Sequence, residues 1–158
     1  MRKTWIFGIF LGLSLTGAAF AQEGSLRFEK TVPWTTGKMM DLNATVGPVR
    51  VGKVELSNQG KSGGGGASGI AARFRSGGNS DTETILRATF DTENPKEEEW
   101  EVTYTLEFLD SKGRLIDRAE GSEGFEGEAD TYKLDHAILE YVVPMIDKVR
   151  IKLEAKLD

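Results

Sequence analysis

The chain of 158 residues contains no cysteine. It can therefore form no disulfide, no zinc–thiolate site and no cysteine nucleophile, and it lacks the residue to which a lipoprotein anchor is attached. Packing alone must stabilise the domain that it forms.

Histidine is nearly as scarce, since His136 is the only one. A Ser-His-Asp hydrolase would have to use this residue, and a zinc site would need at least two further ligands around it. His136 stands beside Asp135, and nothing in the spacing singles out a serine partner. We predict a surface or loop histidine without a catalytic or ligand role, and a protein that is not an enzyme and binds no cofactor.

Basic residues are outnumbered, with 20 Lys and Arg against 25 Asp and Glu. Nucleic acids and anionic membrane surfaces attract proteins that carry basic patches. The charge balance therefore argues against both kinds of partner.

A long apolar run occurs only at the start of the chain. The uncharged segment 4–21 follows two basic residues, and the small residues Ala19 and Ala21 fit the pattern that signal peptidase cleaves. We predict a signal peptide over 1–21 with cleavage after Ala21, and hence a periplasmic or extracellular protein that is not inserted in a membrane. The alternative is an uncleaved anchor, because the run is at the short end of the length that spans a bilayer.

Loss of this peptide would remove Arg2 and Lys3 and leave 18 basic residues against 25 acidic ones, a net charge of −7. Residues 22–158 have the usual length of one domain and can bury one core. We therefore predict a single domain over 22–158.

Alternation of apolar and polar residues dominates this domain. In "WEVTYTLEF" (100–108) five large side chains share one face, and Thr and Glu occupy the other. The segment "VRIKLEAKL" (149–157) repeats the pattern, with Leu157 as its last inward residue. Such period-two alternation indicates strands with one buried face.

Weaker alternation predicts further strands at 25–32, 48–58, 70–75 and 84–91. Within the second of these the pattern slips by one residue at Gly52 and Lys53, which indicates a β-bulge. The segment "DSKG" (110–113) has the Asp and Gly of a type I turn. It predicts a hairpin between 100–108 and 114–121.

Short strands separated by turns predict an all-β fold, a two-sheet antiparallel sandwich of immunoglobulin or fibronectin-III type. The segment "DHAILEYVVPMID" (135–147) does not alternate. Asp135 could cap one short helix near 135–143 that ends before Pro144. A strand or an irregular crossover fits this segment almost as well.

The segment "LEFLDSKGRLI" (Leu106–Ile116) resembles the strand-turn-strand signature of FxLYD-type and related secreted immunoglobulin-like domains. In that signature an apolar alternation runs into Leu-aromatic-Asp-x-x-Gly, and here Phe108-Leu109-Asp110 replaces the usual order. The resemblance implies an accessory or interaction module without a shared catalytic site, and it carries over no functional residues.

The segment "GKSGGGGASG" (60–69) contains the Gly-Lys-Ser end of a phosphate-binding loop. That motif needs a glycine five residues before Gly60, where this chain has Glu55, and the glycines after Ser62 cannot begin a helix. The same residues match the G-x-S-x-G nucleophile elbow, which requires an α/β sheet. We predict a flexible Gly-rich loop between two strands.

Two acidic segments raise the question of calcium. The segment 91–99 has Pro95 and Lys96 where a calcium loop needs Asp or Asn and Gly. We expect the segment 120–130 to form a flexible acidic loop whose carboxylates could hold the ion. Its candidate metal ligands are Glu120, Glu123, Glu126, Glu128 and Asp130. The other interpretation of these residues is a set of solvated edge charges that resist strand pairing.

Glycan binding would need exposed aromatic side chains, and Trp34, Tyr132 and Tyr141 are available. The chain shows no triad, metal cluster or cofactor motif, and sandwich domains usually bind through loops and sheet edges. We expect an exported, non-catalytic module that binds an unidentified protein partner through 60–69 or 120–130. The alternative is a module that binds calcium or a glycan through the acidic loop.

Overall fold

The computed structural model describes residues 25–61 and 83–157. The predicted signal peptide, the strand predicted at 70–75 and the Gly-rich segment beyond Lys61 lie outside these ranges. The described residues include no helix that is long and apolar enough to cross a membrane.

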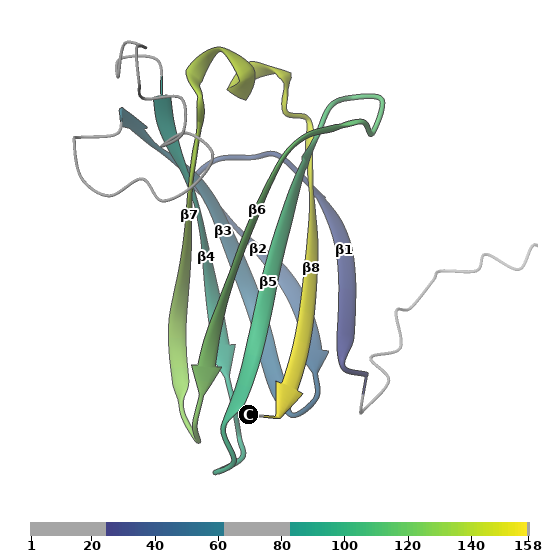
Figure 1. Cartoon of the computed structure of the whole chain (residues 1–158), viewed down its shortest axis with the longest axis vertical. Coiled ribbons are helices and arrows are strands. Elements are labelled where there is room, and N and C mark those ends of the chain that lie inside the picture. Colours follow the sequence, from purple (N-terminus) through teal and green to yellow (C-terminus); the bar gives the residue numbers. More distant parts are fainter. Residues whose placement is uncertain (1–24, 62–82, 158) are drawn as a thin grey trace, which may run out of the picture.

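Eight strands and one short helix make up the described part of the chain. They are β1 (Arg27–Pro33), β2 (Lys38–Val46), β3 (Val49–Lys61), β4 (Glu83–Glu93), β5 (Trp100–Leu109), β6 (Leu115–Phe125), β7 (Ala129–Leu139), the 3-10 helix η2 (Glu140–Met145) and β8 (Lys148–Leu157). Sheet A has the order β1-β8-β5-β6 and sheet B the order β2-β3-β4-β7, and all neighbouring strands are antiparallel. The two sheets pack against each other (Figure 1), which confirms the predicted all-β two-sheet sandwich.

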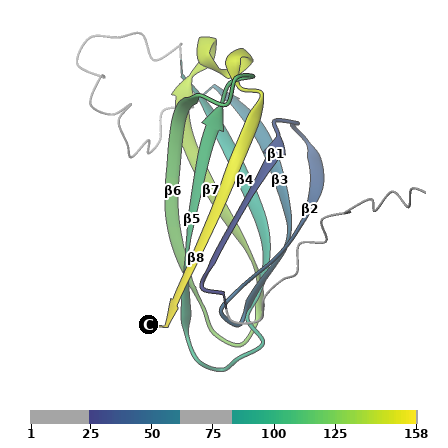
Figure 2. The same cartoon turned by 90° about the vertical axis from the view of Figure 1, so that its right-hand side faces the viewer.

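The connections bring distant strands together. Strands β2, β3 and β4 form a meander, β5 and β6 form a hairpin, and β8 inserts between β1 and β5. The first strand thus lies beside the last, whereas the immunoglobulin constant domain places its first strand beside the second. Strands β1 and β2 run together along one border of the sandwich, and β6 and β7 along the other (Figure 2).

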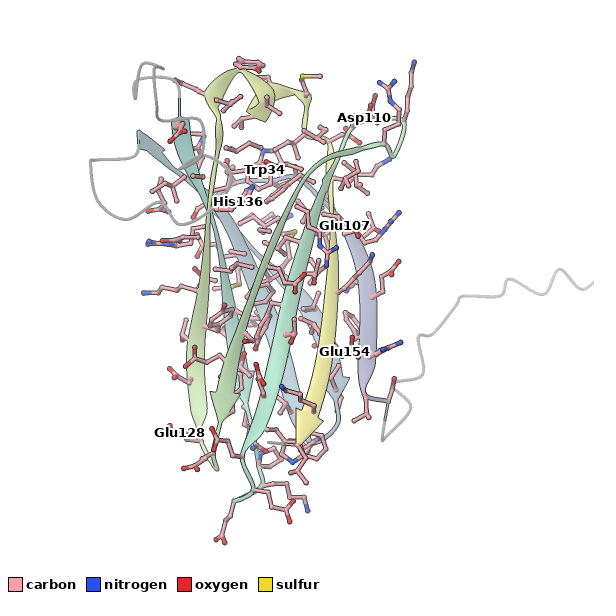
Figure 3. All side chains as sticks on the ribbon, in the orientation of Figure 1. Trp34, Glu107, Asp110, Glu128, His136 and Glu154 are labelled. Atoms are coloured by element: carbon pink, nitrogen blue, oxygen red, sulfur yellow. The ribbon has the colours of Figure 1, made fainter. Side chains whose placement is uncertain are left out.

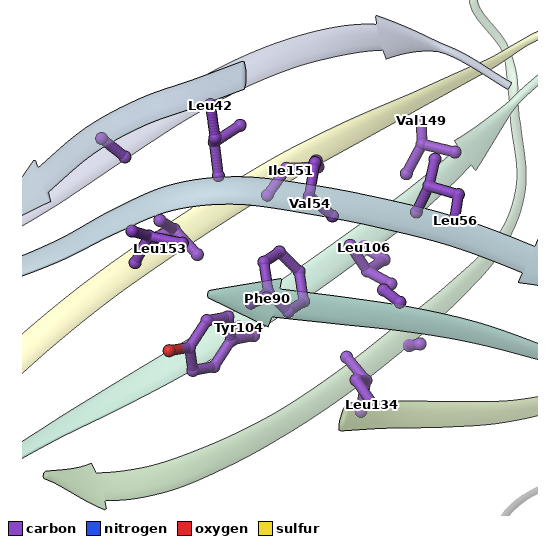
Figure 4. Close-up of a cluster of buried hydrophobic side chains, with 14 of the residues drawn as sticks. Leu42, Val54, Leu56, Phe90, Tyr104, Leu106, Leu134, Val149, Ile151 and Leu153 are labelled. Atoms are coloured by element: carbon purple, nitrogen blue, oxygen red, sulfur yellow. The ribbon is translucent and has the colours of Figure 1, made fainter. Parts of the chain in front are cut away.

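The core lies between the sheets and is built from the inward residues of each alternating strand. Phe90, Tyr104, Leu106, Ile151 and Leu153 are each at most 1% exposed (Figure 4). The inward faces predicted for β4, β5 and β8 are therefore confirmed over most of their length.

The predicted inward faces fail at one end of the sandwich. Leu157 is 60% exposed, although we expected it to face the core, and Leu26 is 49% exposed at the same end. Leu157 is the last residue of β8, and Leu26 precedes β1. At such positions the opposite sheet no longer covers the side chain, so alternation overestimates the buried length of a strand.

The predicted β-bulge and the predicted hairpin turn are both present. The register between β3 and β4 shifts between Val51 and Lys53, which confirms the bulge at Gly52. In the turn after β5, the Gly113 N–H donates to the Asp110 carbonyl at 2.9 Å, and Gly113 has a φ of 77°. A type I turn followed by a left-handed glycine is a common hairpin connection, and the predicted β5–β6 hairpin is confirmed.

The predicted helix near 135–143 is wrong in its position. Residues 135–139 belong to β7, whose pairing with β4 satisfies their backbone groups. Asp135 caps no helix, because its carboxylate accepts two hydrogen bonds from Arg87 at 2.6 and 2.8 Å. The short helix η2 follows, and Pro144 lies inside it rather than after it. A single 3-10 segment has few internal hydrogen bonds for proline to interrupt.

Candidate functional site

The predicted acidic loop at 120–130 is not a loop. Glu120 and Glu123 lie on β6, Asp130 lies on β7, and only residues 126–128 connect the two strands. The turn is tight because Gly127 adopts a φ of 56°. The expectation failed because both flanks find partners, β6 along β5 and β7 along β4.

This arrangement spreads the predicted metal ligands over both sheets. Glu120 pairs with Arg118, whereas Glu126 and Glu128 are exposed near the turn. Asp130 accepts a hydrogen bond from the Thr131 N–H. Among residues 25–61 and 83–157, no three acidic or histidine side chains are grouped so that they could hold a metal ion. Calcium binding by these carboxylates stays a prediction.

His136 lies on β7 with its side chain only 21% exposed. Its Nε2 lies 3.0 Å from Asp117 Oδ2 on β6, and its ring stacks on Phe108 with 5.7 Å between ring centroids. Trp34 packs edge-on against Phe108 with 6.1 Å between ring centroids. Figure 3 labels Trp34 and His136 in the same region of the sandwich. The expected surface or loop position is wrong, because β7 turns this residue toward the space between the sheets.

The Asp117–His136 pair links one sheet to the other. Burial opposes ionisation of Asp117, but hydrogen bonds from His136 and from the Arg118 N–H outweigh it and hold the pKa of Asp117 below its ordinary value. The imidazole of this pair packs on the Phe108 ring, so the pair is part of the packing between the sheets. We interpret it as a polar bridge that closes the β6–β7 border of the sandwich.

A second bridge closes the opposite border. The Lys30 ammonium on β1 donates to the Asp41 carbonyl of β2 at 2.9 Å and lies 3.4 Å from the Leu42 carbonyl. These carbonyls lie at the register shift of β2, beside Asn43 with its φ of 50°. An inward-pointing lysine and a bulge are both known ways to keep an edge strand from pairing with another chain. The borders are therefore poor surfaces for strand addition.

The outer face of sheet A is covered by paired charges. Glu107 accepts hydrogen bonds from Arg150 and Lys152, which hold the pKa of Glu107 below its ordinary value, with Lys152 as the main cause. Arg27 and Glu154 pair at 2.7 Å across β1 and β8. Because these charges neutralise one another, this face has the character of a solvated surface.

A shallow hollow lies on the outer face of sheet B, above the two register shifts. Its volume is about 680 Å³, and its lining includes Asn43, Arg50, Asp91, Glu93 and Asp130. Its charged side chains come from β3, β4 and β7, and the hollow is open to solvent. It offers polar contacts without a large apolar side chain to anchor a ligand.

The clearest exposed feature is the end of the sandwich that carries η2. Four large apolar side chains face solvent here, and we call this surface the η2 end: Leu115 (59% exposed), Leu139 (39%), Tyr141 (70%) and Met145 (56%). They come from the start of β6, the end of β7 and the helix between β7 and β8, which all lie at this end (Figure 1). They are four of the seven large apolar side chains that are exposed among the described residues.

The η2 end rests on an anchored backbone. Ile146 is buried, and the Asp147 N–H donates to the Leu109 carbonyl at 2.9 Å. The Asp147 carbonyl accepts from the Trp34 N–H at 2.9 Å, and Val142 and Val143 pack against the core. One side of η2 is thereby held in place, while Tyr141 and Met145 extend from it.

The three predicted glycan-binding aromatic residues do not share a surface. Trp34 packs on Phe108, and Tyr132 packs against Tyr104 with 4.5 Å between ring centroids. Only Tyr141 protrudes. Sequence reasoning missed the η2 end as a whole, although the unbroken apolar run "YVVPM" beside a proline was a signal that some of these residues had no core face to join.

Comparison with known proteins finds no match for the chain among family models, curated proteins or solved structures. The resemblance of Leu106–Ile116 to FxLYD-type domains therefore stays a prediction.

Proposed function

We propose that this chain is an exported, non-catalytic β-sandwich that binds a protein partner through the η2 end, in the periplasm or outside the cell. The observation that carries the proposal is the gathering of four exposed apolar side chains at one end. Clustered exposed apolar groups are typical of interaction sites, whereas single ones are not.

The composition of the η2 end supports this use. Tyr and Met are enriched at the centres of protein interfaces, where a few large side chains supply most of the binding energy. Tyr141 and Met145 extend from a helix in which Val142 and Val143 pack against the core, and the buried Ile146 that follows it donates its N–H to the Val143 carbonyl. A surface that is already ordered loses little entropy when it binds.

The proposal moves the contact surface away from one region that the sequence suggested. Residues 120–130 are mostly strand, and their edge is closed by the Asp117–His136 bridge. Binding through the Gly-rich segment 60–69 stays a prediction, because its residues beyond Lys61 lie outside the described ranges.

Affinity capture with matched variants tests the proposal. The tagged protein is cross-linked in its native envelope fraction, and the products are identified by mass spectrometry. We expect the double variant Tyr141→Ser/Met145→Ser to lose the partner that the unchanged protein recovers. The control Leu26→Ser/Leu157→Ser alters side chains of similar exposure at the opposite end and should retain it. Equal recovery by both variants, at equal melting temperatures, would contradict the proposal.

A further inference from the structure

We propose that the partner at the η2 end is a second copy of this chain, related by a two-fold axis. The inference rests on the proposed function, because it uses the same surface. It goes further in naming the partner, and the charges that flank the apolar side chains carry it.

Two exposed charges at this end are not used by the fold. Arg114 pairs with Asp110 at 2.7 Å, and Lys148 lies 3.5 Å from Asp147, so these four groups neutralise one another. The exposed charges that remain are Lys112 in the β5–β6 turn and Glu140 at the start of η2, which lies near the half-buried Glu83. Neither side chain forms an ion pair with any residue of the described ranges, and both residues are exposed.

These opposite charges lie on opposite sides of the apolar group. Glu140 directly follows β7, while the β5–β6 turn projects on the far side of η2 (Figure 1). Asp110 marks the base of this turn in Figure 3, and Lys112 lies two residues further along. The η2 end is therefore basic on one side, apolar in the middle and acidic on the other, where Glu83 pairs in register with Leu139.

A surface with this pattern is complementary to itself. A two-fold rotation about an axis through the η2 end exchanges its two sides, and it sets Lys112 of each copy against Glu140 of the other. The same rotation places Tyr141 and Met145 of the two copies together. A partner with one sign of charge, such as an anionic membrane surface or a basic peptide, would match only one side.

The expected dimer is weak. The contact is the end of a sandwich rather than a face, so it belongs among the smaller interfaces. Exposed charges at the rim of an interface determine the relative orientation of the two copies more than they increase the affinity. Association should therefore depend on concentration and weaken as salt screens the two ion pairs.

Charge reversal gives a test that depends on the two-fold axis. The mass of the purified exported chain is followed by sedimentation velocity from about 1 µM to about 1 mM. We expect the unchanged chain to form dimers, and Lys112→Glu or Glu140→Lys alone to dissociate at least about tenfold more readily, because each creates two like-charge contacts. An equal mixture of the two variants should recover dimers, since each mixed dimer restores both ion pairs.

Two further variants complete the design. Tyr141→Ser should abolish dimers without altering charge. Lys96→Glu with Glu97→Lys reverses two exposed charges in the turn before β5, at the opposite end, and should leave dimers unchanged.

Each result of these experiments either supports the dimer or overturns it. A chain that is monomeric throughout the range overturns the inference, as does a dimer that is indifferent to Tyr141→Ser or to the mixing of the charge variants. A monomeric chain that still captures another protein through Tyr141 overturns the inference alone and leaves the proposed function standing. If neither dimer formation nor partner capture depends on the η2 end, both the inference and the proposed function are wrong.

Discussion

Adding one methyl group at Gly121 should destabilise this sandwich. Gly121 lies on β6 opposite Tyr104, and Tyr132 reaches over it from β7. A Cβ at this position would lie 2.3 Å from the Tyr132 hydroxyl oxygen and 2.9 Å from Leu134 Cδ1. Both distances are shorter than any normal van der Waals contact, so Tyr132 or the edge strand has to move.

The loss of stability depends on how far the Tyr132 ring can move away from the added methyl group. Tyr132 packs against Tyr104 at 4.5 Å and Phe90 at 6.4 Å between ring centroids, so its ring has little freedom to shift. Overpacking in such surroundings usually costs about 1–3 kcal/mol. For a domain of this size each kcal/mol lowers the melting temperature by roughly 3–5 °C, so we expect Gly121→Ala to lower it by about 3–15 °C.

The assay is thermal and urea unfolding of Gly121→Ala beside two companions. Gly52→Ala is the control, because a Cβ there meets nothing within 4 Å and the backbone is not left-handed. It should be neutral or slightly stabilising. Tyr132→Phe removes the hydroxyl that causes the closest contact, so the double variant Gly121→Ala/Tyr132→Phe should recover part of the loss.

The reasoning fails on either of two results. If Gly121→Ala and Gly52→Ala unfold at the same temperature, β6 and β7 are not packed as closely as the structure has them. If the double variant is as unstable as the sum of its two single changes, Tyr132 is not the obstacle.

Two other predictions concern the polar bridges. The pKa of Asp117 is lower in the folded than in the unfolded chain, so its stabilising contribution is complete above its unfolded value near pH 4 and is lost as the pH falls through the folded value. Urea midpoints between about pH 7 and pH 3 should therefore fall less steeply for Asp117→Asn than for the unchanged protein, and equal slopes would refute this bridge. Lys30→Met should lower the free energy of unfolding by about 0.5–1.5 kcal/mol, because the Asp41 carbonyl loses its donor, whereas the exposed Lys53→Met should change it little.

Much of the local structure could be predicted from short stretches of sequence. The alternation through β5 and β8 shows which side chains face the core, since successive residues of a strand point to opposite sides. The β5–β6 turn follows from Asp110 and Gly113, and the β3 bulge follows from the slip at Gly52. Each of these features depends on residues within a few positions of one another.

The predictions failed where a segment depends on a distant partner. Asp135 could cap a helix, but its strand pairs with β4, and Arg87 on β4 donates two hydrogen bonds to its carboxylate. The residues from Glu120 to Asp130 look like a loop because they are rich in glycine and acid, yet both ends pair with neighbouring strands. In each case hydrogen bonds to another strand outweighed a weak local preference.

The sequence by itself determined an all-β chain with strands, a turn and a bulge at definite places, because side-chain alternation and turn chemistry are properties of neighbouring residues. Only the tertiary structure decided that β1 lies beside β8, that Asp117 meets His136, and that Leu115, Leu139, Tyr141 and Met145 gather uncovered at one end. Strand order joins segments that are far apart in the chain, and no local pattern records which apolar residues the finished sandwich leaves outside.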